Sequence, residues 1–376
     1  MKIALLTDGI HPYVIGGMQK HSYYLAKELA KQGHSVYLFH CNESAYDATQ
    51  LEFFSAEEKA NIKGFLIPFP RKNYFPLHYI YESYKYSQAI ANALEPVLPE
   101  MDFIFAQGFS AWDLLNKKKL KNLPPIAVHF HGLEMFQKIP SVKSIINSFF
   151  LRRAVRKNLT MADYAISYGG KITAILNRIV DKSKIWEIPA GIEKSWFLDT
   201  APTVSNKVRF VFIGRYERRK GIPELNEAIT GLLRDHSFSF EFIGDIPQKH
   251  RVLYPTIKYH GKVTSENEIK QILSHCDVLV CPSYAEGMPN VIMEAMACSL
   301  AVIATNVGAV SVLVDQDNGW LIKDPAVKSI SGAMQAAMAI QDNSLQQKKI
   351  NSSAKIKNGF SVEEVTNKLI IKVINI

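Results

Sequence analysis

Strand-like and helix-like segments alternate along nearly the whole 376-residue chain, and this alternation restricts the fold more than any other feature. The clearest helix is expected at residues 17–32, where Gly33 provides the stop. The alternation predicts an α/β fold, with parallel sheets covered by helices on both faces. Short apolar runs typical of buried strands recur at residues 2–8, 35–41, 102–106, 125–130, 163–168 and 184–189.

The alternation breaks once, near the middle of the chain. Residues 196–206 lose the periodicity and are typical of a linker. The pattern then restarts with a strand at 208–214, followed by strands near 238–243, 278–282 and 301–305. A chain of this length is sufficient for two domains. We therefore predict two doubly wound domains, residues 1–195 and 207–359, with a cleft between them.

Composition excludes several classes of protein. The chain is 47% hydrophobic and 21% charged, which is typical of a globular protein. Its longest apolar runs have strand length, well below the roughly 20 residues of a membrane span. The sequence enters a strand directly after Met1, without the cleavage site of a signal peptide, and no Cys-x-x-Cys pair is present. These features predict a cytoplasmic protein whose four cysteines are reduced core thiols.

The net charge of +9 is concentrated in one region. Residues 117–184 carry 14 Lys and Arg against 3 acidic residues, a local net charge of +11. At its centre we predict an amphipathic helix, residues 141–157, which is either a core helix with a solvated basic face or a helix on an anionic membrane surface. No nucleic-acid motif accompanies the charge, so no nucleic-acid partner is expected. The helix carries Ile145, Ile146, Phe149 and Phe150 on the apolar side and Arg152, Arg153, Arg156 and Lys157 as the candidate membrane contacts.

Two carboxylates eight positions apart, Glu286 and Glu294, mark the strongest candidate site. Glu286 lies in a Gly/Pro loop after a buried strand, and Glu294 lies in the helix that follows. Pro289 is typical of a first helical turn, so free amides suited to phosphate are expected beside Glu286. Both carboxylates are therefore predicted at the carboxyl edge of a parallel sheet, where ligands bind in open α/β folds.

A basic loop follows the strand at 208–214 in the same domain. Gly214 ends that strand, and Arg215 and Lys220 come before the next helix. Two cations at this edge suit a diphosphate leaving group, because negative charge builds up on it as the bond breaks. The loop is not a Walker loop, since the Gly-Lys-Ser/Thr ending is missing. By themselves the two cations are typical of surface charges. Because the Glu286 segment belongs to the same domain, we interpret them as a diphosphate site.

The first domain offers weaker candidates. Gly16 and Gly17 precede a helix and let the backbone approach a phosphate, although a structural turn explains them almost equally well. His131 follows a strand and is expected to meet substrate, whereas His129 is expected in the core with its polar atoms satisfied. No third ligand accompanies the two histidines, so no metal is expected. Residues 315–317, an Asp-x-Asp pattern, are interpreted as a turn before a further strand at residues 320–322.

In this order, these motifs resemble a family 4 retaining glycosyltransferase of the GT-B fold, over nearly the whole chain. The motifs that carry the resemblance are Gly16-Gly17, Gly33-His34, residues 188–192, Gly214-Arg215 with Lys220-Gly221, Gly261 with Val263, and residues 286–294. The resemblance implies two Rossmann-like domains facing across a cleft, with a helix at about 360–376 that crosses back to the first domain. It implies a nucleoside-diphosphate sugar as co-substrate and no other cofactor.

The resemblance also assigns roles to residues. It implies that Arg215 and Lys220 bind the donor diphosphate, that Glu286 contacts the donor sugar and that Glu294 holds the ribose. It places His131 under the sugar, near the anomeric carbon. In such enzymes the acceptor attacks from the face of the leaving phosphate, which takes its proton, so no second catalytic carboxylate is needed, and the two cations replace a metal. Further donor contacts are implied at Gly16, Gly17, Gly214, Val263 and the amides of Met288, Pro289 and Asn290.

We therefore expect transfer of a hexosyl unit from a UDP- or GDP-sugar to a glycan or lipid-linked glycan. The setting would be synthesis of cell-surface polysaccharide, lipopolysaccharide or glycolipid, by a cytoplasmic protein in peripheral contact with the inner membrane face. Two alternatives stay open: a nucleotide-sugar 2-epimerase of the same architecture, and a non-catalytic nucleotide-sugar-binding subunit. The chain departs from the family pattern at Ala190, Ser299, Ala301 and residues 308–312.

Overall fold

The chain divides into two compact units in the computed structural model. The first comprises Met1–Phe136, Val142–Gly191 and Val362–Ile376, and the second comprises Gln137–Ser141 and Ile192–Ser361. Residues 199–200 and 205–206 of the predicted linker lie outside the described residues. The structure describes residues 1–42, 51–71, 78–118, 120, 122–138, 142–198, 201–204 and 207–376, without the side chains of residues 142–147.

The first unit is built on a seven-stranded parallel sheet in the order β3-β2-β1-β4-β5-β6-β7. The order reverses between β1 and β4, because the chain builds outward from β1 to β3 on one side and then returns to the other. Such a reversal is the point where ligands bind in open α/β sheets. The strands are β1 (Lys2–Leu6), β2 (Ser35–His40), β3 (Ile62–Leu66), β4 (Phe103–Gln107), β5 (Ile126–His129), β6 (Tyr164–Ser167) and β7 (Ile185–Glu187).

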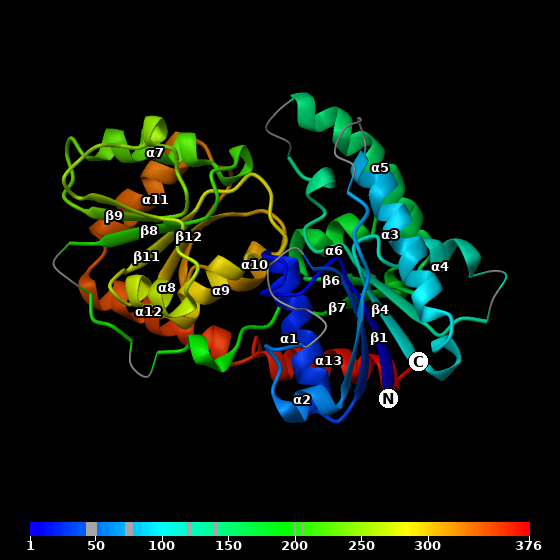
Figure 1. Cartoon of the computed structure of the whole chain (residues 1–376). Helices are drawn as coiled ribbons and strands as arrows, with labels where there is room; N and C mark the ends of the chain where they lie inside the picture. Colours follow the sequence, from blue (N-terminus) through cyan, green and yellow to red (C-terminus); the bar gives the residue numbers. More distant parts are fainter. Residues whose placement is uncertain are drawn as a thin grey trace. The chain divides into compact units, whose positions relative to one another are not determined.

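Helices cover both faces of this sheet, because alternate residues of each strand point to opposite sides. Ile3 and Leu5 of β1 pack with α1 (Gly17–Lys31) and α13 (Val362–Ile374), which contact each other. Ala4 and Leu6 pack on the other face with α3 (His78–Leu94) and α4 (Trp112–Lys117). The prediction that a C-terminal helix returns to the first domain is confirmed by α13 (Figure 1). The unit also contains α2 (Ala56–Ala60), α5 (Val142–Met161) and α6 (Gly170–Leu176).

The second unit repeats the plan with six parallel strands in the order β10-β9-β8-β11-β12-β13. Here the order reverses between β8 and β11. The strands are β8 (Arg209–Ile213), β9 (Ser239–Ile243), β10 (Ile257–Gly261), β11 (Val278–Cys281), β12 (Ala301–Thr305) and β13 (Gly319–Ile322). The helices are α7 (Ile222–Leu232), α8 (Glu266–Ser274), α9 (Asn290–Ala297), α10 (Val310–Leu313), α11 (Val327–Ala339) and α12 (Asp342–Lys357).

The predicted class, α/β with two doubly wound parallel sheets, is confirmed. Two strands escaped prediction, and both lie at a sheet edge. In β3 only Ile62 is buried, and in β10 no residue is fully buried. An edge strand has one neighbour and partial exposure, so its sequence lacks the apolar run that marks a central strand.

A buried carboxylate in the second unit pairs with one buried and one half-buried cation. Asp277, just before β11, accepts from Lys349 Nζ of α12 at 2.8 Å, and both side chains are 0% exposed. Arg209 of β8 donates to the same carboxylate from Nε at 3.0 Å and from Nη2 at 3.1 Å. Burial lowers the pKa of Lys349, although Asp277 opposes that shift. The cluster attaches α12 to the centre of the sheet.

We expect Asp277→Ala to lower the free energy of unfolding by about 3–5 kcal/mol, because it leaves two cations without their counter-charge. Lys349→Met should cost less, since Asp277 keeps its paired bonds to Arg209. Urea unfolding followed by circular dichroism measures both variants. A loss in Lys349→Met as large as that in Asp277→Ala would contradict a cluster centred on the carboxylate.

Candidate active site

The order reversal in the second unit brings the two predicted motifs together. Strands β8 and β11 are hydrogen-bonded neighbours, with Phe210 beside Val278. Because both strands are parallel, the loops that follow them leave from the same edge of the sheet. Lys220 Nζ, from the loop after β8, donates to Glu286 Oε1 of the loop after β11 at 2.6 Å. The two side chains are only 12% and 8% exposed, so the ion pair is largely removed from water.

Close backbone contacts fix both loops. Gly221 has φ +71°, and a Cβ there would lie 2.1 Å from the carbonyl oxygen of Pro282, so only glycine fits. Gly308 has φ +53°, and its Cβ would lie 2.1 Å from the carbonyl oxygen of Glu286. The next amide, Ala309, donates to the Gly287 carbonyl at 2.8 Å. Gly308 and Ala309 therefore support the loop that carries Glu286. They are the first two residues of the segment 308–312, which departs from the family pattern.

The predicted cations do not all meet at Glu286. The Arg215 side chain is 80% exposed and pairs with Glu217 Oε1 at 3.0 Å. Arg219, which no sequence motif indicated, lies between the two carboxylates: its Nε donates to Glu217 Oε2 at 2.8 Å, and its Nη1 lies 3.4 Å from Glu286 Oε2. The charges thus alternate in sign from Arg215 through Glu217, Arg219 and Glu286 to Lys220.

The charge state of Glu286 follows from these neighbours. Burial by itself would raise the pKa of its carboxyl group. Lys220 and Arg219 outweigh burial, so the pKa lies below the ordinary value and the group is ionised at neutral pH. Gln137 supplies a further contact, donating from Nε2 to the Glu286 carbonyl oxygen at 2.6 Å.

The remaining predicted donor contacts lie around this pair. Glu294 is buried in α9, and Asn290 is the first residue of that helix. One expectation is wrong on chemical grounds: Pro289 precedes α9 but has no backbone N–H to offer a ligand, and its carbonyl accepts from Ile292. Met288, another predicted donor contact, is buried. Gly214 follows β8, and its amide donates to the Ile243 carbonyl oxygen. Val263 follows β10 and is half-exposed.

His131 lies at the corresponding edge of the sheet in the first unit. Its Nε2–H donates to Gln107 Oε1 at the end of β4, and the Tyr168 hydroxyl donates to Nδ1, both at 2.6 Å. His131 has φ +51°, a strained conformation for a residue with a side chain, and these bonds hold it. Burial lowers its pKa well below the ordinary value, with His21 adding to the shift, so the ring is neutral. Sequence reasoning gave no signal for Gln107 or Tyr168.

His129 is not satisfied as predicted. Its side chain is buried, yet neither ring nitrogen has a hydrogen-bond partner. The His129 ring stacks on that of His131 with centroids 4.0 Å apart, and the His21 ring lies 5.5 Å from it. Among the described residues no group of three or more His, Cys, Asp or Glu side chains is arranged to hold a metal ion.

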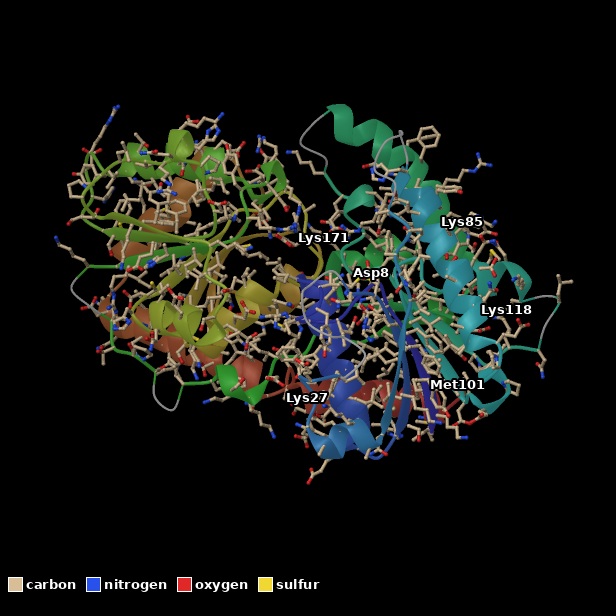
Figure 2. The ribbon with its side chains drawn as sticks, viewed as in Figure 1. Asp8, Lys27, Lys85, Met101, Lys118 and Lys171 are labelled. Carbon is tan, nitrogen blue, oxygen red and sulfur yellow. The ribbon has the colours of Figure 1, made fainter. Side chains whose placement is uncertain are left out.

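Two glycines and an acid surround the start of α1. Gly16 is the residue before the helix and Gly17 is its first residue. Asp8, labelled in Figure 2, follows β1 and accepts from Gln19 Nε2 at 2.9 Å. Burial raises the pKa of Asp8 to about 6, although Gln19 opposes the shift.

The basic residues of α5 fall on two sides of the helix. Arg153, Arg156 and Lys157 are exposed, together with Phe149 and Phe150. Arg152 is half-buried and donates from Nε to the Met135 carbonyl. The guanidinium groups of Arg152 and Arg156 both lie over the Phe136 ring. Ile145 and Ile146, expected on the apolar side, lie outside the described side chains.

The Asp-x-Asp pattern forms the predicted turn. The Asp317 amide donates to Asp315 Oδ1 at 2.9 Å, and Lys355 pairs with Oδ2 at 2.6 Å. The four cysteines are all buried and unpaired, as expected of core thiols. Among the described residues, no helix has both the length and the apolar character that crossing a bilayer requires.

Comparison with known proteins identifies the fold and the family. The whole chain superposes on sucrose-phosphate synthase from Thermosynechococcus elongatus, with a TM-score of 0.80, 18% identity and 98% of that chain covered. HepE of Anabaena, solved in complex with UDP and glucose, gives a TM-score of 0.70 at 18% identity, with both chains fully covered. The two doubly wound units are therefore those of the GT-B fold.

The sequence matches the family described as Glycosyltransferase Family 4 over residues 15–196, and the one described as Glycosyl transferases group 1 over residues 207–339. A segment of 124 residues is 38% identical to TuaC of Bacillus subtilis, a glycosyltransferase assigned to teichuronic acid biosynthesis. That match covers 33% of this chain and only 31% of TuaC. The chain belongs to the group 1, family 4 glycosyltransferases.

The buried histidines generate a pH prediction. Burial lowers the pKa of His21 from 6.5 to about 4. Between these values the unfolded chain binds a proton that the folded chain does not, so the free energy of unfolding falls as the pH is lowered through this window. The slope is at most about 1.4 kcal/mol per pH unit for each such histidine. His21→Phe should lose less stability than the wild type between about pH 6.5 and pH 4.

Asp8 acts with the opposite sign, because its raised pKa makes the folded chain bind the extra proton. The quantity to measure is therefore the difference between wild type and His21→Phe, by urea unfolding across this pH range. An identical pH dependence in the two proteins would show that the folded chain does not suppress protonation of His21.

Proposed function

We propose that this protein is a retaining glycosyltransferase, which transfers a hexosyl unit from a nucleoside-diphosphate sugar to a glycan or lipid-linked glycan. The observation that carries the proposal is the buried Lys220–Glu286 ion pair, at the carboxyl edge of the second sheet and beside the start of α9. This arrangement supplies cations for a diphosphate, a fixed carboxylate for sugar hydroxyl groups and helix amides for a phosphate. Glu294, buried further along α9, would hold the ribose.

In the proposed reaction the acceptor hydroxyl oxygen forms a bond to the anomeric carbon on the face where the bond to phosphate breaks. The hydroxyl proton passes to the departing phosphate oxygen, so the reaction balances without a protein base. Lys220 and Arg215 would stabilise the negative charge that grows on the diphosphate. His131 would act in the donor-sugar site as a neutral, fixed ring, since both nitrogens are engaged.

The donor and acceptor are proposed at the level of class. HepE, a structural relative, was solved with UDP and glucose, and TuaC is assigned to teichuronic acid biosynthesis. Together with the diphosphate site these relatives support a UDP- or GDP-sugar donor and a role in cell-surface polysaccharide or glycolipid synthesis. We propose no metal in the reaction, because Arg215 and Lys220 provide the charge that a divalent cation would supply.

We also propose that α5 contacts an anionic membrane surface, where a lipid-linked acceptor would lie. Its exposed side combines two aromatic rings, Phe149 at 66% and Phe150 at 44% exposed, with Arg153, Arg156 and Lys157. Aromatic rings insert at the headgroup boundary and basic groups attract anionic lipids. The protein would then work as a peripheral protein on the cytoplasmic face.

The proposed activity is tested by measuring nucleoside-diphosphate release from UDP-, GDP- and ADP-sugars, with and without chelator and cell-lipid extract. We expect release from one donor, dependent on the extract and insensitive to chelator. Glu286→Ala should abolish most of it, whereas Glu363→Ala, an exposed residue of α13, serves as the matched control. Release without an acceptor would support an epimerase or a hydrolase, and full activity in Glu286→Ala would refute the assigned site.

The membrane proposal predicts weaker binding when basic residues leave the exposed side of α5. Arg153→Gln with Lys157→Gln should reduce partitioning onto phosphatidylglycerol vesicles about tenfold or more at low salt, since each basic group contributes about 1 kcal/mol. Arg152→Gln is the internal control, because that side chain is half-buried over Phe136. Vesicle sedimentation measures all three proteins. Equal losses in control and double variant, or no loss in either, would exclude this surface.

A further inference from the structure

We propose that Arg219 is a positioning residue, which keeps the Glu286 carboxylate in place when Lys220 turns to the donor diphosphate. This inference rests on the proposed function. Each oxygen of the carboxylate has its own cation: Lys220 Nζ lies 2.6 Å from Oε1, and Arg219 Nη1 lies 3.4 Å from Oε2. The shorter contact belongs to the residue that the diphosphate will also attract.

Donor binding creates an electrostatic conflict at this point. The diphosphate brings negative charge close to Glu286, and the single charge of Lys220 must then serve two anions. Like charges within a few ångströms in a largely buried site repel strongly and favour protonation of the carboxylate. A protonated or displaced Glu286 would no longer accept hydrogen bonds from sugar hydroxyl groups. A second cation that stays on Glu286 removes the conflict.

The contacts of Arg219 hold it beside Glu286. Its Nε donates a hydrogen bond to Glu217 Oε2 at 2.8 Å, and its Nη1 also approaches the Ala285 carbonyl oxygen at 3.4 Å. Its own carbonyl oxygen accepts from the Tyr284 amide at 2.7 Å, so main chain and side chain are both attached to the loop that carries Glu286. The side chain is 29% exposed, against 80% for Arg215, which shares Glu217 and is open to a ligand.

The neighbouring Arg218 offers a matched control. Residues 218–220 form a 3-10 turn, in which successive side chains are rotated by about 120°. Arg218 therefore points elsewhere: it pairs with Glu224 at 2.6 Å and lies over the Tyr284 ring, 4.8 Å from its centroid. Arg218→Gln and Arg219→Gln remove the same charge from adjacent positions, and only the second removes a contact with Glu286.

The test compares Arg219→Gln, Arg219→Lys and Arg218→Gln in steady-state transfer from the identified donor across a range of pH. For Arg219→Gln we expect kcat to fall about tenfold or more, the loss of a charge-assisted hydrogen bond, with a smaller change in the donor KM. The acid limb of kcat should move to higher pH, because Glu286 has lost a cation. Arg219→Lys should restore much of both, and Arg218→Gln should match the wild type. A wild-type pH profile in Arg219→Gln would overturn the inference.

A second measurement keeps this inference separate from the proposed function. Carbon-13 NMR titration of labelled glutamate, assigned with Glu286→Gln, reports the pKa of Glu286 in the absence of turnover. Arg219→Gln should raise that pKa both alone and with added UDP or GDP, and Arg218→Gln should leave it unchanged. A wild type without transfer activity would refute the proposed function alone; an unchanged Glu286 pKa in Arg219→Gln would refute the role of Arg219 whatever the reaction.

Discussion

The parallel pairing of β8 with β11 is the constraint on which the site depends. The two strands are separated in sequence by β9, β10 and their helices, yet they lie side by side at the point where the strand order reverses. The loops that follow two neighbouring parallel strands leave the sheet next to each other, so Lys220 and Glu286 can come within 2.6 Å. Without that reversal the two motifs would remain ordinary charged loops.

Charge alternation explains how several ionised groups can share this edge of the sheet. Each of the two carboxylates, Glu217 and Glu286, lies between two cations, so both have opposite charges beside them. Bonds of this kind are directional, and small shifts of either loop would break them. The close approaches at Gly221 and Gly308 remove that freedom. The Asp277 cluster also places a carboxylate between two cations, but at the amino ends of β8 and β11, where its role is stability.

The sequence was sufficient for the fold class and for the central strands, because their apolar runs and regular spacing reflect burial on both faces. It missed β3 and β10, whose residues are mostly exposed or half-buried. It found Glu286 and Lys220, yet in the run Glu217-Arg-Arg-Lys220 nothing separates Arg219 from Arg218. Only the 3-10 turn decides which arginine reaches Glu286. The unsatisfied nitrogens of His129 likewise depend on three-dimensional neighbours that no local pattern encodes.

The return of α13 to the first unit has a consequence for the order of events during synthesis. Val365, Leu369, Ile370 and Val373 belong to the same apolar core as β1 and α1, although more than 150 residues of the second unit are translated in between. During translation, part of one face of the first sheet would therefore stay uncovered until α13 has been synthesised. The second unit is continuous from Ile192 to Ser361 apart from a five-residue segment that is synthesised earlier, so its core does not depend on a later part of the chain. The half of the chain made last would then be the first able to complete its core.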